Sequence, residues 1–420
     1  MSTLRLISHP AALARRMPRA AAFWVVGATV VAMLAASSAP SPLYPVYQQE
    51  FGFSALELTT IFAVYVLALL VSLLTVGRLS DFVGRRPVLA AALAVEAIAM
   101  AVFLDAGSST WLLAARTVQG LATGAAIGVL GAYLLDLQPA DGSRLGSLVN
   151  SAAPATGLGV GALGTGLLVQ YGPHPTRLVF LILIVVFAAL AVVTAALPET
   201  VRRMPGAVAS LRPQVAVPAP ARKAFAAAVP TMMATWALGG LMLSVGGSLV
   251  RTVFGAPNSA VVGLVLGIFA GSGALAAVLV SRMAPAPMER LGTLALVVGS
   301  GLFLTALALS SLGLFVVAAV VAGSGFGAGF LGSLRSVTQL ARPHERAALL
   351  SAVYLASYLA FSIPALVAGV LITHVGLRET ALWYGGLVGV AALVSLVAGS
   401  VVARPAATAA RPCPQLQTQS

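Results

Sequence analysis

The chain has 420 residues, of which 59% are hydrophobic and only 8% are charged, with a mean hydropathy of +1.00. Soluble globular proteins carry about 25% charged residues, so this composition excludes a soluble globular protein and indicates an integral membrane protein. The net charge of +13 does not imply a nucleic-acid partner, because basic loops also bind the anionic cytoplasmic surface of a membrane.

Residues 1–22 form a basic tail ahead of the first apolar run. The arginines Arg15, Arg16 and Arg19, followed by an apolar stretch and the small residues AASSAPS, also fit a cleavable signal peptide. We favour a retained first span, because its removal would leave eleven spans and break the symmetry between the two halves of the chain.

Twelve apolar runs are long enough to cross a membrane, since a spanning helix needs about 20 apolar residues. They lack the period-two alternation of a membrane β-barrel. The sequence therefore predicts an all-α polytopic membrane protein with twelve transmembrane helices in two six-helix bundles. The predicted spans are residues 23–45, 58–79, 87–104, 110–136, 145–170 and 177–197, then 224–250, 259–281, 290–311, 313–335, 346–372 and 379–403.

The basic residues indicate the orientation. Twenty of the 24 Lys and Arg residues fall on the side of the two termini, whereas Arg177, Arg251 and Arg378 fall on the other side. Cytoplasmic loops carry the excess of Lys and Arg, so both termini are predicted to be cytoplasmic. The preference for arginine over lysine and the abundance of Ala and Gly suggest a GC-rich bacterial genome, and hence the inner membrane.

Two glutamates of the first half have different expected roles. Ser54 and Glu57 have the spacing of a capping box, so Glu57 is predicted to be structural. Glu96 lies midway along the third span with no charged neighbour in sequence. A carboxyl group there could carry a proton, or could be a neutral group bonded to a neighbouring helix, and both alternatives stay open.

Charge is concentrated in the turn between the second and third spans, GRLSDFVGRRP. Gly77 permits close approach of a neighbouring helix, and Gly84 can adopt the positive φ that a short turn needs. Arginines alone would satisfy the topology, so Asp81 indicates a further role. The alternative is a solvated turn that only sets the topology.

Arg116 lies inside the fourth span, where a charge costs about 2.5–3.5 kcal/mol on insertion scales. Arg116, Gly120, Gly124 and Gly128 recur every four residues and share one helix face, with Gln119 beside them. We expect the arginine to point inward and to have a function. The alternative is a side chain that reaches outward to the membrane interface.

The Pro- and Arg-rich segment 198–223 is the longest polar interruption and is predicted to be a flexible cytoplasmic linker. Similar features recur on either side of it, because a glycine-rich span precedes both Pro139–Arg144 and Pro343–Arg346. The predicted organisation is a tail (1–22), a six-helix bundle (23–197), the linker (198–223), a second bundle (224–403) and a tail (404–420) that contains the single cysteine, Cys413.

The charged turn resembles the G-x-x-x-D-[RK]-x-G-[RK]-[RK] signature between helices two and three of the major facilitator superfamily. Phe82 stands where that family usually has a basic residue. The resemblance covers nearly the whole chain, from about Ala22 to Ala403. The matching residues are Gly77, Asp81, Gly84, Arg85 and Arg86.

Two further motifs extend the resemblance. The residues from Arg116 to Gly120, RTVQG, are similar to the R-x-x-Q-G motif common in proton-coupled members. The residues from Pro154 to Gly159, PATGLG, resemble a degraded G-P-x-x-G-G motif of drug:proton antiporters, with Ala153 in place of the first glycine. The drug or metabolite:proton antiporter branch is therefore the one that the sequence resembles.

The resemblance implies a latch in which Asp81 meets the cytoplasmic start of helix eleven, near Ala347, when the cytoplasmic gate is shut. The start of that helix would favour the negative charge by roughly 0.3–1 kcal/mol. The expected gating residues are Gly77, Asp81, Gly84, Arg85, Arg86, Asp136 and Arg346. The expected candidates for proton coupling are Arg116, Gln119, Gly120 and Glu96.

The same resemblance implies a central cavity lined mainly by helices one, four, seven and ten. A wall that is mostly apolar suits a lipophilic or amphipathic compound better than a sugar or a phosphate ester, which would need several buried polar partners. The candidate lining residues are Tyr44, Tyr65, Asn150, Pro154, Trp236, Tyr354 and Tyr358.

We therefore predict a secondary transporter that exports a small lipophilic or amphipathic compound in exchange for protons. Proton-coupled uptake of a small metabolite is the main alternative, and a membrane enzyme or sensor is a remote one, because the sequence contains no H-E-x-x-H, G-x-S-x-G or Walker motif. Without a nucleotide-binding loop the energy must come from an ion gradient. The expected partners are the substrate, protons and the lipid bilayer, with no cofactor, metal or nucleic acid, and we expect a monomer.

Overall fold

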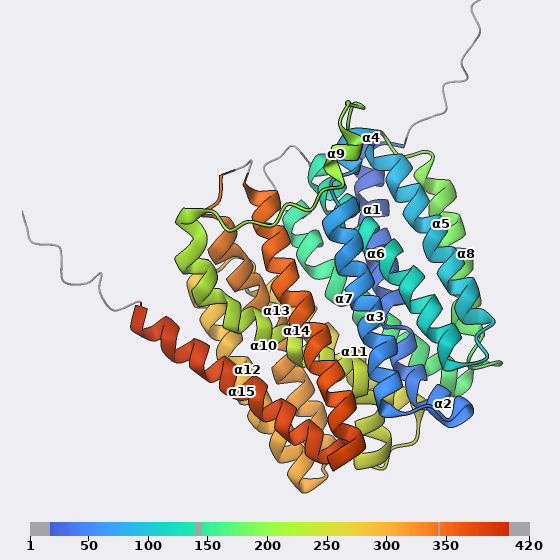
Figure 1. Cartoon of the computed structure of the whole chain (residues 1–420), viewed down its shortest axis with the longest axis vertical. Coiled ribbons are helices and arrows are strands. Elements are labelled where there is room, and N and C mark those ends of the chain that lie inside the picture. The colour runs from blue at the N-terminus through green and yellow to red at the C-terminus, as the bar shows by residue number, and fades with distance from the viewer. Residues whose placement is uncertain (1–16, 140–144, 343–344, 403–420) are drawn as a thin grey trace, which may run out of the picture.

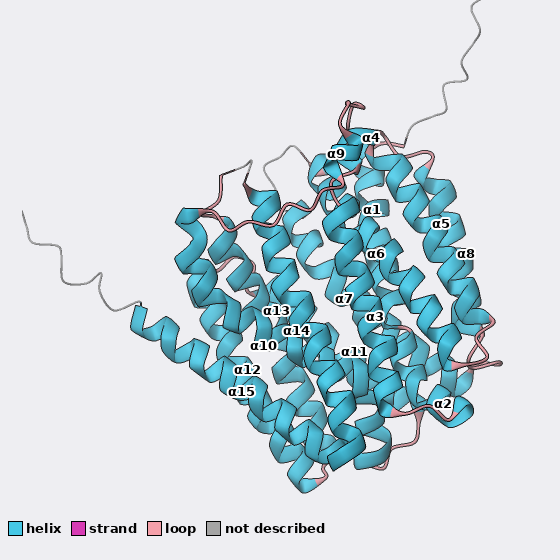
Figure 2. Cartoon of the chain, in the orientation of Figure 1, coloured by secondary structure: helices cyan, strands magenta, loops and turns pink. Residues whose placement is uncertain are grey.

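The computed structural model describes residues 17–139, 145–342 and 345–402, and within these ranges the chain consists of helices and loops without strands (Figure 2). Arg144 and Cys413 lie outside the described residues. The helices of the first half are α1 (Arg19–Ser38), α2 (Pro40–Phe51), α3 (Ala55–Val76), α4 (Ser80–Val83), α5 (Arg85–Leu104), α6 (Ser109–Leu137), α7 (Leu145–Tyr171) and α8 (Leu178–Thr194). The helices that follow are α9 (Ala207–Ser210), α10 (Arg222–Ser248), α11 (Ser259–Leu279), α12 (Pro285–Leu309), α13 (Leu312–Thr338), α14 (Arg346–Val375) and α15 (Leu377–Val402).

Eleven helical segments of the described chain are long and apolar enough to cross a membrane. The first of them joins α1 and α2, and the sixth joins α10 to the short helical turns that flank it. α8 is equally apolar but has only 17 residues, and it occupies the position of the sixth predicted span. The prediction of an all-α polytopic membrane protein is confirmed.

The first span is broken where α1 gives way to α2. Proline has no backbone N–H, so Pro40 cannot donate to the carbonyl of Ala36, four residues earlier. Pro42 and Pro45 follow within the next turn and a half. The break therefore leaves carbonyl groups of α1 without their usual helical partners, and it turns Tyr44 of α2 toward the centre of the first half, where it is buried.

The two halves meet through α7 on α11 and through α3 on α14 (Figure 1). A Cβ atom on Gly166 would lie 2.7 Å from the Cα atom of Gly263, so only glycine permits this approach of α7 and α11. The rings of Phe62 and Phe361 join α3 to α14, with 5.1 Å between their centroids. These contacts lie toward the end of the molecule that carries α2, and we call the other end, with α4 and α9, the charged end.

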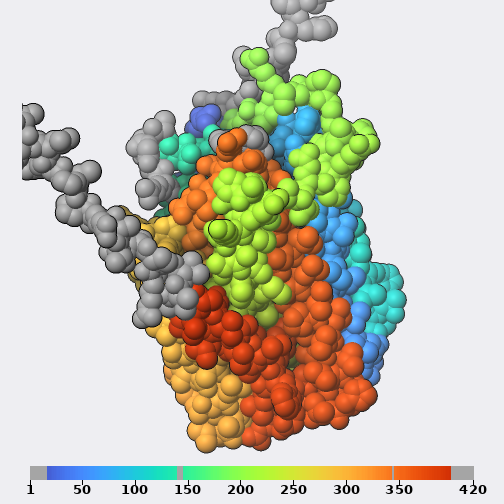
Figure 3. All heavy atoms as spheres, turned by 60° about the vertical axis from the view of Figure 1, so that its left-hand side comes forward, coloured from blue at the N-terminus to red at the C-terminus, as the bar shows by residue number. Residues whose placement is uncertain are grey.

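The segment between α8 and α10, the predicted linker, is hydrogen-bonded to both halves. Met204 N donates to Phe82 O (2.9 Å), and Ala216 N donates to Ala348 O of α14 (3.2 Å). Figure 3 shows the green segment on the surface, running beside the orange α14 toward the blue helices of the first half. The apolar ring of Phe82 faces Gly206 of this segment, a contact to which a basic side chain is poorly suited.

Candidate functional site

Arg116 of α6 is completely enclosed in the first half, with 1% of its surface exposed. Its Nε and Nη2 atoms donate to the hydroxyl of Tyr44 at 2.9 and 2.5 Å. Its Nη1 atom donates to the backbone carbonyl of Ser37 (2.9 Å) and to Oε1 of Gln119 (2.7 Å). The arginine therefore points inward, and it does not reach out to the membrane interface.

Aromatic rings cover the guanidinium group from two sides. Its central carbon lies 4.7 Å from the ring centroid of Tyr65 and 5.5 Å from that of Tyr44. The hydroxyl of Tyr65 donates to Ser37 Oγ (2.7 Å), which fixes the ring in place. A cation buried against ring faces gains about 2 kcal/mol or more when it is desolvated. Among the described residues, the partners that touch the arginine are all uncharged, so no carboxylate there contacts its positive charge directly.

Gln119 connects the arginine to an acid. Its Oε1 accepts from Arg116, while its Nε2 donates to Oε1 of Glu96 (3.1 Å) and to the carbonyl of Ala36 (3.0 Å). The carbonyl of Ala36 is free to accept because Pro40 has no N–H. Glu96 of α5 is fully buried and faces α6, where Thr123 Oγ1 lies 3.3 Å from its Oε2 atom.

The geometry around Glu96 accommodates a carboxylate and a carboxylic acid equally well. Thr123 Oγ1 also lies 2.9 Å from the backbone carbonyl oxygen of Gln119. The single hydroxyl proton of Thr123 can be donated to only one acceptor at a time. An ionised Glu96 would accept the Thr123 proton, and a protonated Glu96 would donate from Oε2 to Thr123 while still accepting from Gln119. A proton bound at Glu96 would thus change the charge near Arg116 without leaving either side chain's polar atoms unsatisfied.

The glycines that follow Arg116 bring α3 against α6. A Cβ on Gly120 would lie 2.8 Å from the Cβ of Ala68, and a Cβ on Gly128 would lie 2.8 Å from the Cα of Gly77. Close packing of the two helices places the Tyr65 ring over Arg116. Gly77 and Gly120 therefore act through the approach of the helices.

The second half presents a cluster of rings around Trp236 of α10. The ring centroids of Tyr358, Phe330, Phe361 and Phe326 lie 4.9, 5.3, 5.4 and 5.9 Å from the Trp236 centroid. We call these five rings the aromatic cluster. Within the part of the chain that the structure describes, the buried Nε1 of Trp236 has no hydrogen-bond partner.

Tyr354 stacks on Tyr358 at the edge of the aromatic cluster, with 6.0 Å between ring centroids. The cluster is connected to the arginine network across the seam between the halves. Phe361 contacts Phe62 of α3, and Tyr65, one turn further along the same helix, covers Arg116. The two groups of residues therefore lie on either side of the contact between α3 and α14.

Two of the predicted cavity residues lie elsewhere on α7. Asn150 is exposed near the start of that helix and faces Gly131 of α6. Pro154 is half-buried, and the two glycines that follow face different neighbours: a Cβ on Gly157 would lie 2.8 Å from the Cβ of Leu34 in α1, and a Cβ on Gly159 would lie 3.2 Å from Gly267 O in α11. This stretch serves the packing of α7 between the two halves.

At the charged end, Arg85 is the centre of a cluster of polar groups. It pairs with Asp81 (2.5 Å) and with Asp136 (3.2 Å), and it donates to Ser80 Oγ (2.7 Å). Gly84 precedes it with a φ of 106°, a conformation that side chains rarely adopt. The cluster joins α4, the start of α5 and the end of α6.

Glu199, which we did not single out from the sequence, closes this cluster. Its carboxylate accepts from the backbone N–H groups of Arg85 (2.8 Å) and Arg86 (3.1 Å), and so caps the start of α5. The next residue, Thr200, donates to Asp136 (2.7 Å). The Arg86 guanidinium donates to the carbonyl of Ala195. The only signal in the sequence was an acidic residue two positions after the end of the sixth predicted span.

Arg346 lies outside the cluster in which we expected it. Its Nε donates to the carbonyl of Ala341 (3.3 Å), and it forms no ion pair with Asp81. The physical reason lies in how the halves meet. The contacts between helices of different halves lie toward the α2 end, whereas at the charged end Ala216 of the intervening segment lies against the first turn of α14. The latch across the two halves is not formed in this structure.

These helices define a polytopic membrane protein. The sequence model of the Major Facilitator Superfamily matches residues 25–298, and the chain belongs to this superfamily. Its members are transporters of small molecules, so the protein is not an enzyme. A comparison with curated proteins finds no match.

Two solved structures share the fold. A mutant of the nucleoside transporter NupG superimposes with a TM-score of 0.67 at 14% sequence identity, covering 92% of this chain and 100% of its own. The human organic anion transporter MFSD10 (TETRAN) superimposes with a TM-score of 0.61 at 18% identity, covering 90% of this chain and 100% of its own.

Proposed function

We propose that this transporter exports a small lipophilic or amphipathic compound in exchange for protons by alternating access. The observation that carries the proposal is the buried network of Arg116, Gln119 and Glu96. A buried charge is costly in a membrane protein, and intramembrane ionisable residues mark ion or substrate pathways. Here one amide separates the arginine from the acid, so proton binding to Glu96 alters the field at Arg116.

The proton and the substrate act on opposite sides of one helix contact. Protonation of Glu96 removes the charge that balances Arg116, and Arg116 holds α2 through Tyr44 and α3 through the Tyr65 ring. Phe62 of α3 in turn packs on Phe361 of the aromatic cluster. A proton can shift the equilibrium between two states only if its affinity differs between them, and the repositioning of α3 supplies such a difference.

The aromatic cluster supports a lipophilic substrate. Its rings offer broad apolar faces, and Nε1 of Trp236, which has no partner among the described residues, offers one hydrogen-bond donor. A compound with an aromatic or aliphatic body and one acceptor group would satisfy both. A sugar or a phosphate ester would leave several polar groups unpaired against these rings.

We further propose that the protein resides in the bacterial inner membrane with both termini, and the charged end, in the cytoplasm. The excess of arginine at that end supports this orientation. A membrane potential of 100 mV supplies about 2.3 kcal/mol for each charge moved, so the proton gradient is a sufficient source of energy.

The test uses inverted membrane vesicles whose lumen is acidified by respiration, with a panel of lipophilic dyes as substrates. Wild type should release protons from the lumen when a transported dye is added, and Arg116→Ala should release none. Arg116→Lys should recover part of the flux, because the charge survives although the forked geometry does not. Arg177→Ala, which removes an exposed arginine, is the matched control and should behave as wild type.

The outcomes separate the alternatives. Equal proton release by wild type and by Arg116→Ala, at equal expression, would remove the arginine network from the coupling mechanism. Dye accumulation that a protonophore increases supports export. Proton entry accompanied by uptake into whole cells would instead establish the symporter.

A further inference from the structure

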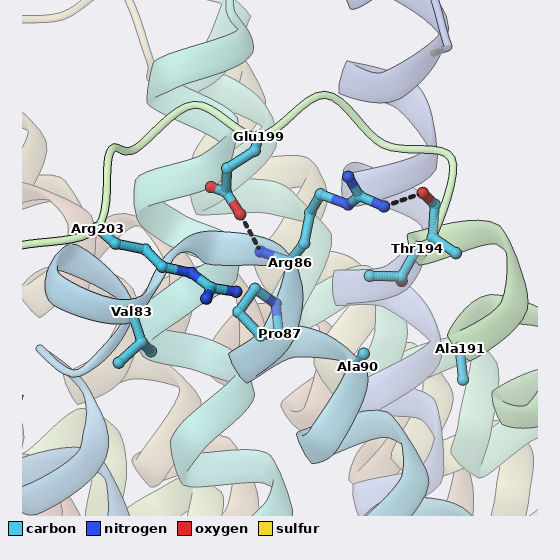
Figure 4. A pocket seen from close by; sticks show the side chains of 9 residues that line it. Val83, Arg86, Pro87, Ala90, Ala191, Thr194, Glu199 and Arg203 are labelled. Carbon is cyan, nitrogen blue, oxygen red and sulfur yellow. Dashed lines mark hydrogen bonds between the residues drawn. The ribbon is translucent and has the colours of Figure 1, made fainter. Parts of the chain in front are cut away.

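A hollow of about 450 Å³ lies on the outer side of the first half, at the charged end and away from the seam between the halves. Figure 4 shows it between the start of α5, the end of α8 and the chain that follows α8. Its floor is apolar and its rim is charged. The apolar lining includes Val83, Pro87, Ala90 and Ala191, and the charged lining consists of Arg86, Glu199 and Arg203.

The short sixth span creates this hollow. With 17 residues, α8 is roughly 26 Å long, which is less than the hydrocarbon thickness of about 30 Å. The chain leaves the helix after Thr194 and turns over the start of α5, where the Tyr133 hydroxyl donates to Pro198 O (2.6 Å). The hollow therefore lies at the end of a predicted span, where the lipid head groups are expected.

The charges at the rim favour an anion. Arg203 is exposed, and in the described residues its side chain has no hydrogen bond or ion pair. Arg86 uses Nη2 to bind Ala195 O, which leaves its other N–H groups free for a ligand. The carboxylate of Glu199 is already engaged by the N–H groups of Arg85 and Arg86. The rim thus carries two cations and one carboxylate that is bound to the backbone.

We propose that this hollow binds the phosphate of an anionic phospholipid, with the acyl chains lying along α5 and α8. Arginine presents forked N–H groups that match phosphate oxygens. A soluble anion would gain nothing from the apolar floor. The floor continues into the apolar outer surface of the helices, where Ile98 of α5 and Val192 of α8 are 57% and 74% exposed. A lipid that binds Arg86 and Arg203 together would tie the segment after α8 to the start of α5.

The experiment measures lipid binding to the purified full-length protein by native mass spectrometry, with phosphatidylglycerol and phosphatidylcholine titrated separately. Wild type should bind the first phosphatidylglycerol at least about fivefold more tightly than phosphatidylcholine, the factor that one arginine near an anionic surface supplies. Arg203→Gln should lose that preference, and Arg86→Gln should weaken it. Arg202→Gln, which removes the neighbouring exposed arginine that does not line the hollow, should retain it.

Equal preference in wild type, Arg203→Gln and Arg202→Gln would overturn the proposal, as would loss of the preference in both variants to the same extent. A further arm adds inorganic phosphate at millimolar concentration. Failure of phosphate to displace phosphatidylglycerol supports a lipid site. Displacement of phosphatidylglycerol by millimolar phosphate would mean that the hollow binds a soluble anion and would overturn the assignment to a lipid.

Discussion

The first half of the transporter encloses a buried arginine and a buried glutamate linked by one glutamine, whereas the second half places four rings around a tryptophan whose Nε1 has no partner in the described structure. The polar atoms of the first arrangement are hydrogen-bonded to one another, and its electrostatic energy depends on the charge of Glu96. The second is apolar and offers one donor. The difference suggests a division of tasks, with proton binding in the first half and substrate binding in the second.

The two halves also differ at the charged end. In the first half, Arg85 at the start of α5 pairs with Asp136 at the end of α6. In the second half the corresponding helix, α12, has the acid Glu289 in its first turns, and this acid accepts from Ser336 of α13 (3.1 Å). The pair of neighbouring helices therefore recurs, but its polar contact differs, so the residues of one half do not predict the roles of their counterparts.

The largest effect should come from Glu96→Gln. Glutamine preserves the size and the hydrogen bond from Gln119 but cannot release a proton, so the variant should lose the accumulation of substrate driven by a pH gradient. Exchange of labelled for unlabelled substrate needs no net proton movement and should continue. The measurement compares both activities in proteoliposomes, where we expect accumulation to fall by about a hundredfold or more, a range typical of lost acid–base groups.

Glu57→Gln is the matched control for this experiment, because Glu57 is the acid of a capping box at the α2 end and is exposed. It should accumulate substrate as wild type does. Normal accumulation by Glu96→Gln would contradict the division of tasks between the halves, since Glu96 of the first half would then not bind the coupling proton.

The next effect tests the second half through Trp236→Ala. Loss of the ring that contacts four others should raise the KM for a lipophilic substrate about tenfold, equivalent to ~1.4 kcal/mol. Trp236→Phe keeps a ring but removes the donor, and should raise KM by about two- to tenfold only for substrates with an acceptor group. The control is Trp383→Ala, because Trp383 is 72% exposed.

For these tryptophan variants the ratio of protons moved to substrate moved should stay as in wild type. A change in that ratio with an unchanged KM would assign Trp236 to coupling and would remove the division between the two halves.

A smaller effect is expected at the contact that joins the halves, Phe62 with Phe361. Aromatic pairs contribute about 0.5–1.5 kcal/mol beyond their buried area. Phe62→Leu and Phe361→Leu should each shift the population closed at the α2 end by about two- to tenfold, and the double variant should shift it little further. Spin labels at Glu50 and His374, with Cys413 replaced by Ser, report the closed fraction. Additive shifts would show that the two rings act independently.

Much of the fold follows from hydropathy, because each predicted span overlaps a helix of the structure and most ends differ by only a few residues. The capping box of Ser54 and Glu57 is local, and it is formed as the spacing predicts. The sequence could not decide between the two roles of Glu96. Its hydrogen-bond partners come from α6, and the sequence does not determine which face of α5 meets that helix. Glu199 was missed for a related reason, since it caps a helix that begins 114 residues earlier.

The aromatic cluster lies between these extremes. Phe326 and Phe330 are four residues apart on α13, and Tyr354, Tyr358 and Phe361 recur every three or four residues on α14. This spacing predicts two aromatic faces, but only the packing of α10, α13 and α14 brings both to Trp236. Pro40 alone predicts that the carbonyl of Ala36 lacks its helical partner. The sequence does not predict that Gln119 donates to this carbonyl.

The smallest effect sharpens the comparison at the charged ends, through Glu199→Gln. In the first half Glu199 accepts from four backbone N–H groups, two of them at the start of α5, whereas α12 of the second half begins with Pro285 and has no side-chain cap. Glutamine has one accepting oxygen and no charge, so the first turn of α5 should lose about 1 kcal/mol. Amide hydrogen exchange at Arg85 and Arg86 should then be about fivefold faster, while exchange in α12 stays unchanged. Glu379→Gln, which alters an exposed acid in the first turn of α15, serves as the control. Unchanged exchange at Arg85 and Arg86 would show that the charge of Glu199 contributes nothing to the cap, and that the start of α5 is held by the ion pairs of Arg85 alone.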